Sequence, residues 1–80
     1  MSINEVTEKV RKFLIEEFEI EEDKIFPDAN LKSDIGIDSL DFADIAVFIE
    51  DIFGYGLNTD ELRKIGTFKE FCEFIHSKVN

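Results

Sequence analysis

Three helix-start motifs constrain the fold of this 80-residue chain more than any other feature. They run from Ser2 to Glu5, from Asn58 to Glu61 and from Thr67 to Glu70, and in each the first and fourth side chains can satisfy each other's free backbone N–H group. Apolar residues follow the first and third motifs at helical spacing: Ile3, Val6, Val10, Phe13 and Leu14, then Phe68, Phe71, Cys72, Ile75 and Val79. The spacing predicts amphipathic helices from the first motif to about Phe18 and from the third to about Lys78.

The remaining segments complete an all-α prediction. Asp38 is a good N-cap and Gly54 a good C-terminal residue, so a second helix should lie between them, while Gly66 leaves room for only a short helix after Asn58. Residues 19–37 are predicted to form a long loop, anchored in the core by Ile25, Phe26, Leu31 and Ile35. We therefore expect one domain over residues 1–80, a small four-helix bundle with three main helices and one short helix.

The predicted second helix has two distinct faces. At about 3.6 residues per turn, one face is apolar and should be core; it consists of Phe42, Ile45, Ala46, Ile49, Ile52 and Phe53. The opposite face combines acids with small apolar residues, namely Leu40, Ala43, Asp44, Val47, Glu50 and Asp51. A purely solvated face would more often carry charges of both signs.

Acidic residues outnumber basic ones by 19 to 9, so the net charge is −10 at neutral pH. Eight of these acids lie between Ser33 and Leu62, where no Lys or Arg occurs. Either solubility or a docking face for basic partners would explain this clustering. The negative field argues against nucleic-acid and membrane-surface partners, and no apolar run approaches the roughly 20 residues needed for membrane insertion.

Cysteine, histidine and loop patterns exclude several other classes. The single cysteine, Cys72, cannot form an internal disulfide and is predicted to be an inert core thiol, and no secretion signal is visible, so a cytoplasmic protein is expected. His76 has no ligand-like neighbour that would complete a metal site. The acidic loop from Asp28 is not an EF-hand, because Lys32 and Ser33 occupy its fifth and sixth positions and Ser39 its twelfth.

Ser39 lies where the long loop meets the acidic helix. Its hydroxyl should occupy the first helical turn, where unpaired N–H groups and the helix dipole tolerate an attached phosphate. A nucleophilic role is rejected because the elbow pattern G-x-S-x-G is not met. A small bundle with one histidine also offers little room for a base and an oxyanion hole. On capping geometry alone, an Asp-Ser pair at a helix start is more often explained by helix capping than by function.

The order of these elements resembles that of the acyl carrier proteins over essentially the whole chain. The resemblance rests on D-I-G-I-D-S-L-D at residues 34–41, on E-D-I-F-G at the end of the second helix and on T-F-K-E-F at the start of the last. It implies that Ser39, within Asp38-Ser39-Leu40, carries 4′-phosphopantetheine through a phosphodiester added by a phosphopantetheinyl transferase (holo-synthase). The thiol of that arm, and not Cys72, would carry acyl intermediates as thioesters, and the protein itself would not be an enzyme.

The resemblance also assigns roles to the two faces of the second helix. The face implied to meet basic acyl-transferring, condensing or ligase enzymes comprises Leu40, Asp41, Ala43, Asp44, Val47, Glu50 and Asp51. Candidates for lining an acyl cavity are Phe42, Ile45, Ala46, Ile49 and Phe68, which ordinary core packing explains equally well. A monomer is expected.

Departures from the family pattern leave the pathway open. Phe42, Phe48 and Ile52 add bulk, and residues 54–58 lack the usual proline-containing entry to the short helix. The cargo could belong to fatty-acid synthesis or to specialised lipid or polyketide synthesis. The alternatives are a peptidyl or D-alanyl carrier and, in a different class, an unmodified acidic protein-interaction bundle.

Overall fold

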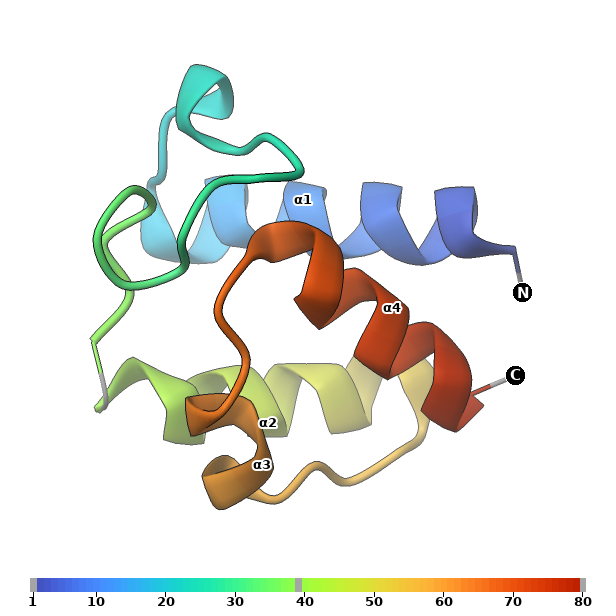
Figure 1. Cartoon of the computed structure of the whole chain (residues 1–80). Helices are drawn as coiled ribbons and strands as arrows, with labels where there is room; N and C mark the ends of the chain where they lie inside the picture. Colours follow the sequence, from blue (N-terminus) through green and yellow to red (C-terminus); the bar gives the residue numbers. More distant parts are fainter. Residues whose placement is uncertain (1, 39, 80) are drawn as a thin grey trace.

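The computed structural model describes residues 2–38 and 40–79, and these residues form four α-helices and one short 3-10 helix. In chain order they are α1 (Ile3–Phe18), the 3-10 helix η1 (Glu22–Lys24), α2 (Asp41–Phe53), α3 (Thr59–Arg63) and α4 (Phe68–Val79). α1 and α2 run in opposite directions on either side of α4, and the long loop joins them at one end of the bundle (Figure 1). The prediction of an all-α bundle with one short helix is confirmed.

The predicted starts of α1 and α4 are confirmed atom by atom. The Ser2 hydroxyl accepts a hydrogen bond from the Glu5 backbone N–H at 3.2 Å. The Thr67 hydroxyl accepts a hydrogen bond from the Glu70 backbone N–H at 3.2 Å. It also donates to the Glu70 carboxylate at 3.0 Å. The bonds from the Glu5 and Glu70 N–H groups each satisfy a donor that has no partner within its own helix.

The predicted end of α2 and the predicted cap at the start of α3 are also confirmed. Gly54 adopts a left-handed φ of 73° just after α2, and its N–H donates to the carbonyl of Glu50 at 2.8 Å. The Asn58 side chain accepts from the Asp60 N–H at 2.8 Å and so caps α3, but it does not form the predicted box with Glu61, whose N–H donates to the Asn58 carbonyl at 3.1 Å. A glycine fits the first of these positions because it has no Cβ to clash in the left-handed region.

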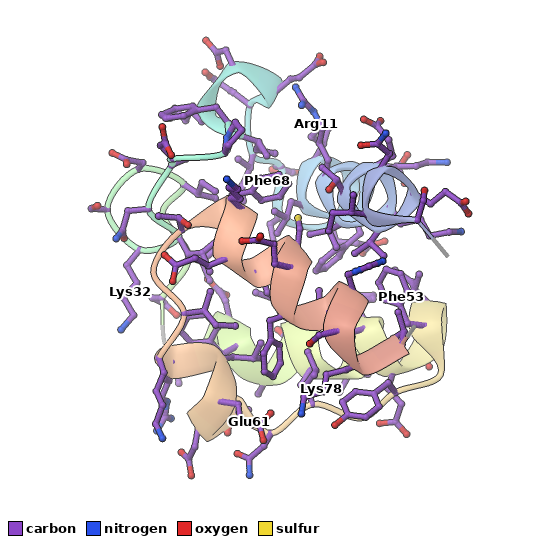
Figure 2. The ribbon with its side chains drawn as sticks, turned by 45° about the vertical axis from the view of Figure 1, so that its right-hand side comes forward. Arg11, Lys32, Phe53, Glu61, Phe68 and Lys78 are labelled. Atoms are coloured by element: carbon purple, nitrogen blue, oxygen red, sulfur yellow. The ribbon has the colours of Figure 1, made fainter. Side chains whose placement is uncertain are left out.

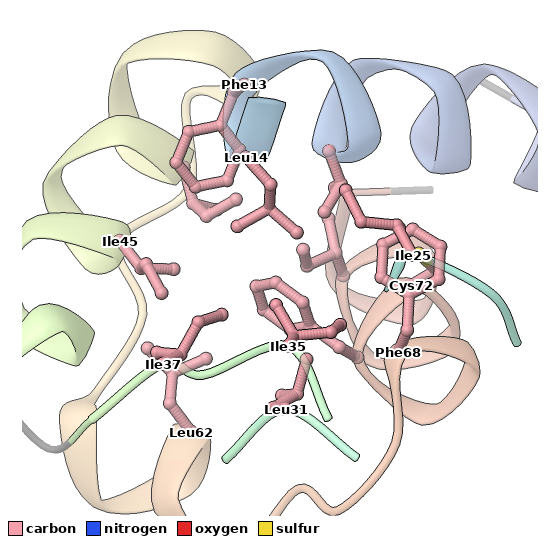
Figure 3. Packing of buried hydrophobic residues seen from close by; sticks show 14 of the residues in the cluster. Phe13, Leu14, Ile25, Leu31, Ile35, Ile37, Ile45, Leu62, Phe68 and Cys72 are labelled. Carbon is pink, nitrogen blue, oxygen red and sulfur yellow. The ribbon is translucent and has the colours of Figure 1, made fainter. Parts of the chain in front are cut away.

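The core draws side chains from every α-helix and from the long loop. Leu14 of α1, Ile45 of α2, Ile37 of the loop and Leu62 of α3 converge with Phe68 of α4 in one buried cluster (Figure 3). Charged side chains such as Lys32 and Glu61 lie at the periphery (Figure 2). Within the two described ranges, no helix is both long and apolar enough to span a bilayer.

Three residues predicted for apolar stripes or anchors face solvent instead. Phe26 is 46% exposed, because the chain turns after it and the Ala29 N–H bonds back to its carbonyl at 2.9 Å, which brings Ala29 into the core in its place. Ile52 is 37% exposed at the edge of a groove between α1 and α2, and Ile3 is 38% exposed in the first turn of α1. The predictions that Phe26 and Ile52 are core residues are therefore wrong.

An aromatic cluster lies at the end of α1, and sequence analysis missed one of its members. The ring centroid of Phe13 lies 5.8 Å from that of Phe18 and 5.5 Å from that of Phe48. Phe48 is half-buried and packs against the core from α2. Its spacing of three residues from Ile45 could have placed it next to the apolar face.

The long loop is tied to the start of α4 by backbone hydrogen bonds. The Leu31 N–H donates to the Gly66 carbonyl at 2.9 Å. In the other direction, the Phe68 N–H donates to the Ala29 carbonyl at 2.9 Å, and the Lys69 N–H donates to the Pro27 carbonyl at 3.0 Å. An isolated antiparallel bridge pairs Asn30 with Thr67. The loop is therefore a fixed part of the fold, and it delivers the chain to the start of α2 along a defined path.

Candidate functional site

A reciprocal pair of aspartates shapes the turn that leads into α2. One carboxylate oxygen of Asp38 accepts from the Leu40 N–H at 2.9 Å and from the Asp41 N–H at 3.2 Å. The Asp41 carboxylate in turn accepts from the Asp38 N–H at 3.2 Å. Asp38 and Asp41 thus form a capping box around residues 39 and 40.

The capping role predicted for Asp38 is confirmed, but the regular helix begins at Asp41, three residues after the predicted start. Leu40 stands in a turn before the helix. The cause is a tighter backbone bond, in which the Asp41 N–H also reaches the Asp38 carbonyl at 3.1 Å. A turn that is closed by a hydrogen bond between residues three positions apart therefore precedes the first α-helical turn, as often occurs at helix ends.

Ser39, the predicted attachment residue, lies outside the described residues, so the site is described by its neighbours. Asp38 is exposed, and Leu40 is 82% exposed. A Cβ placed on Gly36 would meet no atom within 4 Å, and Gly36 has a φ of 91° that a residue with a side chain rarely adopts. The surface on both sides of position 39 is open, which fits a prosthetic group attached at the surface.

Two buried isoleucines hold this exposed segment against the bundle. Ile35 is 6% exposed and Ile37 is 2% exposed, on either side of the exposed Gly36. The Ile37 N–H donates to the Leu31 carbonyl at 2.8 Å. Ile35 was predicted as an anchor and Ile37 was not, although the alternation of Ile35 and Ile37 about a glycine is the pattern of an extended segment with one face buried.

The outer face of α2 is exposed as predicted. Its two large apolar members, Leu40 and Val47, are 82% and 59% exposed. The other exposed residues of this face are Ala43, Asp44, Glu50 and Asp51, whereas Asp41 is half-buried beside the capping box. Because residues 33–62 contain no Lys or Arg, this surface presents negative charge around two exposed apolar side chains. Such a surface favours a partner with basic residues around an apolar contact.

The acyl-cavity candidates occupy the interior. Phe42, Ile45, Ile49 and Phe68 are between 0% and 3% exposed, and the half-buried Ala46 packs against them. The fold brings Phe68 of α4 into the same cluster as the α2 residues, although 15 or more residues separate them in sequence. Core packing accounts for their burial, and a role in lining an acyl cavity stays a prediction.

Cys72 is a core thiol, as predicted. It is 2% exposed, and burial in the apolar interior raises the pKa of its thiol to about 11. A thiol with so high a pKa is a poor nucleophile at neutral pH. Among the described residues, no cluster of three or more His, Cys, Asp or Glu side chains could hold a metal ion.

Comparison with known proteins agrees with this geometry. Residues 8–75 match the profile of a family described as "Phosphopantetheine attachment site". The chain is 35% identical over 80 residues, the full length of both chains, to an acyl carrier protein of Lactobacillus johnsonii. It is 33% identical over 73 residues, 91% of each chain, to an acyl carrier protein of Buchnera aphidicola from the aphid Acyrthosiphon pisum.

Proposed function

The chain belongs to the acyl carrier proteins, whose cofactor is 4′-phosphopantetheine, and from this premise we propose that Ser39 is the attachment residue. The observation that carries the proposal is the open turn between Asp38 and Asp41. It brackets Ser39 within the sequence Asp-Ser-Leu and leaves both neighbours of the serine exposed. Family membership also favours a modified carrier over an unmodified interaction bundle.

The described residues would support attachment only by holding the turn and the preceding loop in place. Asp38 and Asp41 fix the ends of the turn through their hydrogen bonds. Ile35 and Ile37 anchor the preceding loop, so that a modifying enzyme meets a rigid surface. When bound, the arm supplies a thiol that carries an acyl group as a thioester. The chain would act as a carrier, monomeric and cytoplasmic, and not as an enzyme.

The outer face of α2 is the proposed docking surface for partner enzymes. Its acids, Asp44, Glu50 and Asp51, would steer a basic surface into contact, and Leu40 and Val47 would bury apolar area once contact is made. The proposed partners are a phosphopantetheinyl transferase and acyl-transferring, condensing or ligase enzymes of fatty-acid or specialised lipid or polyketide synthesis.

The attachment proposal is tested by loading the protein from coenzyme A with Mg²⁺ and a promiscuous phosphopantetheinyl transferase. Intact-mass spectrometry should show one added phosphopantetheine on the unaltered protein and none on Ser39→Ala. The matched control is Ser33→Ala, which removes an exposed serine of the preceding loop and should load fully. Absence of an adduct on the unaltered protein, or its persistence on Ser39→Ala, contradicts the proposal.

The docking surface is tested by charge reversal. Replacing Asp44 and Glu50 by Lys should slow loading severalfold at low ionic strength, because basic transferases lose their long-range attraction. The difference should shrink near 1 M salt, where the Debye length is about 3 Å. The control makes the same change of charge at two exposed acids of α1, Glu16 and Glu17. Equal slowing of both double variants would show that net charge, and not this face, sets the rate.

A further inference from the structure

A small pocket lies beside the attachment turn, and Asp41, the first residue of α2, is part of its lining. It has a volume of about 260 Å³ and lies where the end of α1, η1 and the loop before α2 meet. Its lining includes Glu19, Glu21, Lys24, Gly36, Ile37 and Asp41. The end of α1 and the green loop segment lie on the same side of the bundle in Figure 1.

The position of the pocket connects it to residue 39. Gly36, Ile37 and Asp41 all lie within three residues of that position in the sequence and all line the pocket. Gly36 is exposed, and the space around it that a side chain would take is empty. A group attached at residue 39 can therefore reach the pocket along its own loop without crossing the bundle.

The walls of the pocket belong to ordered segments. Glu19 caps the end of α1: it has a left-handed φ of 54° and donates its N–H to the Leu14 carbonyl. The side chain of Arg11 bonds to the Glu22 carboxylate at 3.4 Å and so joins α1 to η1. On the other side, the buried Ile37 holds the loop against the core.

The lining combines apolar and charged side chains. Phe18, Ile20, Ile35 and Ile37 are apolar and buried or half-buried, whereas Glu19, Glu21 and Lys24 are exposed charged residues. Carboxylates accept hydrogen bonds from amide N–H groups, and an ammonium group donates to amide or phosphate oxygens. An alkyl chain could contact the apolar side chains, but it would leave the charged groups without partners and would remove them from water at a cost in free energy.

The prosthetic arm has the matching chemistry. It consists of a phosphodiester, a branched carbon with two methyl groups, a hydroxyl and two amides before the thiol. We propose that this pocket binds the pantetheine part of the arm, with Lys24 as a donor to an amide or phosphate oxygen and Glu19 and Glu21 as acceptors from amide N–H groups. The inference rests on the proposed attachment at Ser39, and it assigns the pocket to the arm and not to the acyl chain.

The test compares the apo and loaded proteins by NMR, after intact mass has established complete loading. Failure to load contradicts the attachment at Ser39, whereas the docking inference is judged only on loaded protein. Backbone amide shifts should change at Glu19, Glu21 and Gly36 as well as next to Ser39, and remain unchanged at distant positions such as Glu73 of α4. Changes confined to residues 38–41 in loaded protein would overturn the inference.

A second readout observes the arm itself. The two amide protons of an isotope-labelled arm should exchange with solvent about twofold to tenfold more slowly than those of free coenzyme A, the range that corresponds to one hydrogen bond. Lys24→Ala should reduce this protection and the shift changes in the pocket. Lys64→Ala, which removes another exposed lysine at the end of α3, should leave both unchanged.

The effect of the acyl chain on the pocket shifts is separated from that of the arm by attaching the acyl chain in a last step. If the pocket shifts are present in the thiol form and persist after octanoylation, the arm occupies the pocket. If they arise only after octanoylation, the acyl chain occupies it and the inference is wrong. Equal exchange of the arm amides in the loaded protein and in coenzyme A would also overturn it.

Discussion

The starts of α2 and α4 use the same capping chemistry, but one segment is buried and the other is exposed. At α4, Thr67 caps the helix by accepting from the Glu70 N–H at 3.2 Å, and the next residue, Phe68, is 3% exposed. At α2, Asp38 accepts from the Asp41 N–H at the same distance, yet Leu40 inside the box is 82% exposed. One capping box fixes a core residue, and the other presents its residues to solvent.

The surroundings of the two boxes explain the difference. The start of α4 is joined to the long loop by the Phe68 N–H bond to Ala29 and by the Asn30–Thr67 bridge, so both sides of the segment are covered. Before the start of α2, the described residues Ile35 and Ile37 are buried, whereas Asp38 and Leu40 are exposed. Capping determines where each helix begins, and long-range packing determines whether the segment at its start is buried or exposed.

Truncating the apolar side chain of each box should give the largest difference between the two. Phe68→Ala should lower the free energy of unfolding by about 3–5 kcal/mol, because it leaves a cavity in the core. Leu40→Ala should change it by less than about 0.5 kcal/mol, as expected at an exposed position. Urea unfolding followed by circular dichroism measures both values. Similar losses for the two variants would mean that the start of α2 is packed like that of α4.

The buried Cys72 thiol of α4 predicts that the free energy of unfolding depends on pH. This dependence arises in the core and not at the exposed start of α2. Burial raises the pKa of Cys72 from 9.0 to about 11, so the folded state holds its proton more tightly than the unfolded state. This stabilisation is complete below pH 9 and is lost as the pH rises through 11, an effect of about 2–3 kcal/mol.

The measurement compares the unaltered apo protein with Cys72→Ala, in reducing buffer, from pH 7.5 to pH 10.5. The stability advantage of the unaltered protein over Cys72→Ala should fall by about 2 kcal/mol across this range. All other titrating groups are common to both proteins and cancel in the difference. An advantage that stays constant with pH would show that Cys72 is not desolvated as the fold implies.

Removing the caps themselves should lower stability less than Phe68→Ala does, and it should separate the two starts by function. Thr67→Ala and Asp38→Ala should each cost about 1 kcal/mol, the usual value of an N-cap side chain. Only Asp38→Ala should also slow phosphopantetheine loading, because Asp38 orders the turn around Ser39. Asp38→Asn keeps an oxygen acceptor and should recover most of the stability. If Thr67→Ala slowed loading equally, the two starts would not be functionally distinct.

Sequence analysis located the helices well and the buried residues less well. The caps at Ser2, Asn58 and Thr67 and the glycine after α2 were predictable, because each is a bond between residues at most four positions apart. The exposure of Phe26 was not predictable, since it depends on how the turn at Pro27 aligns the loop with α4.

The candidate site shows the same division. The capping role of Asp38, the acids of α2 and their exposed face could be predicted from spacing and charge, and these residues lie within the range 8–75 that matches the carrier family. The inward position of Ile37 and the pocket beside the turn could not, because they arise where α1, η1 and the loop meet.

The sequence by itself determined the helix boundaries to within a few residues, the acidic face and the motif around Ser39, because these depend on short-range hydrogen bonds and helical periodicity. Only the tertiary structure decided which apolar residues are buried and which way each capped segment faces. Burial depends on contacts between residues far apart in the chain, such as Phe68 with the α2 residues, and no local pattern specifies those contacts.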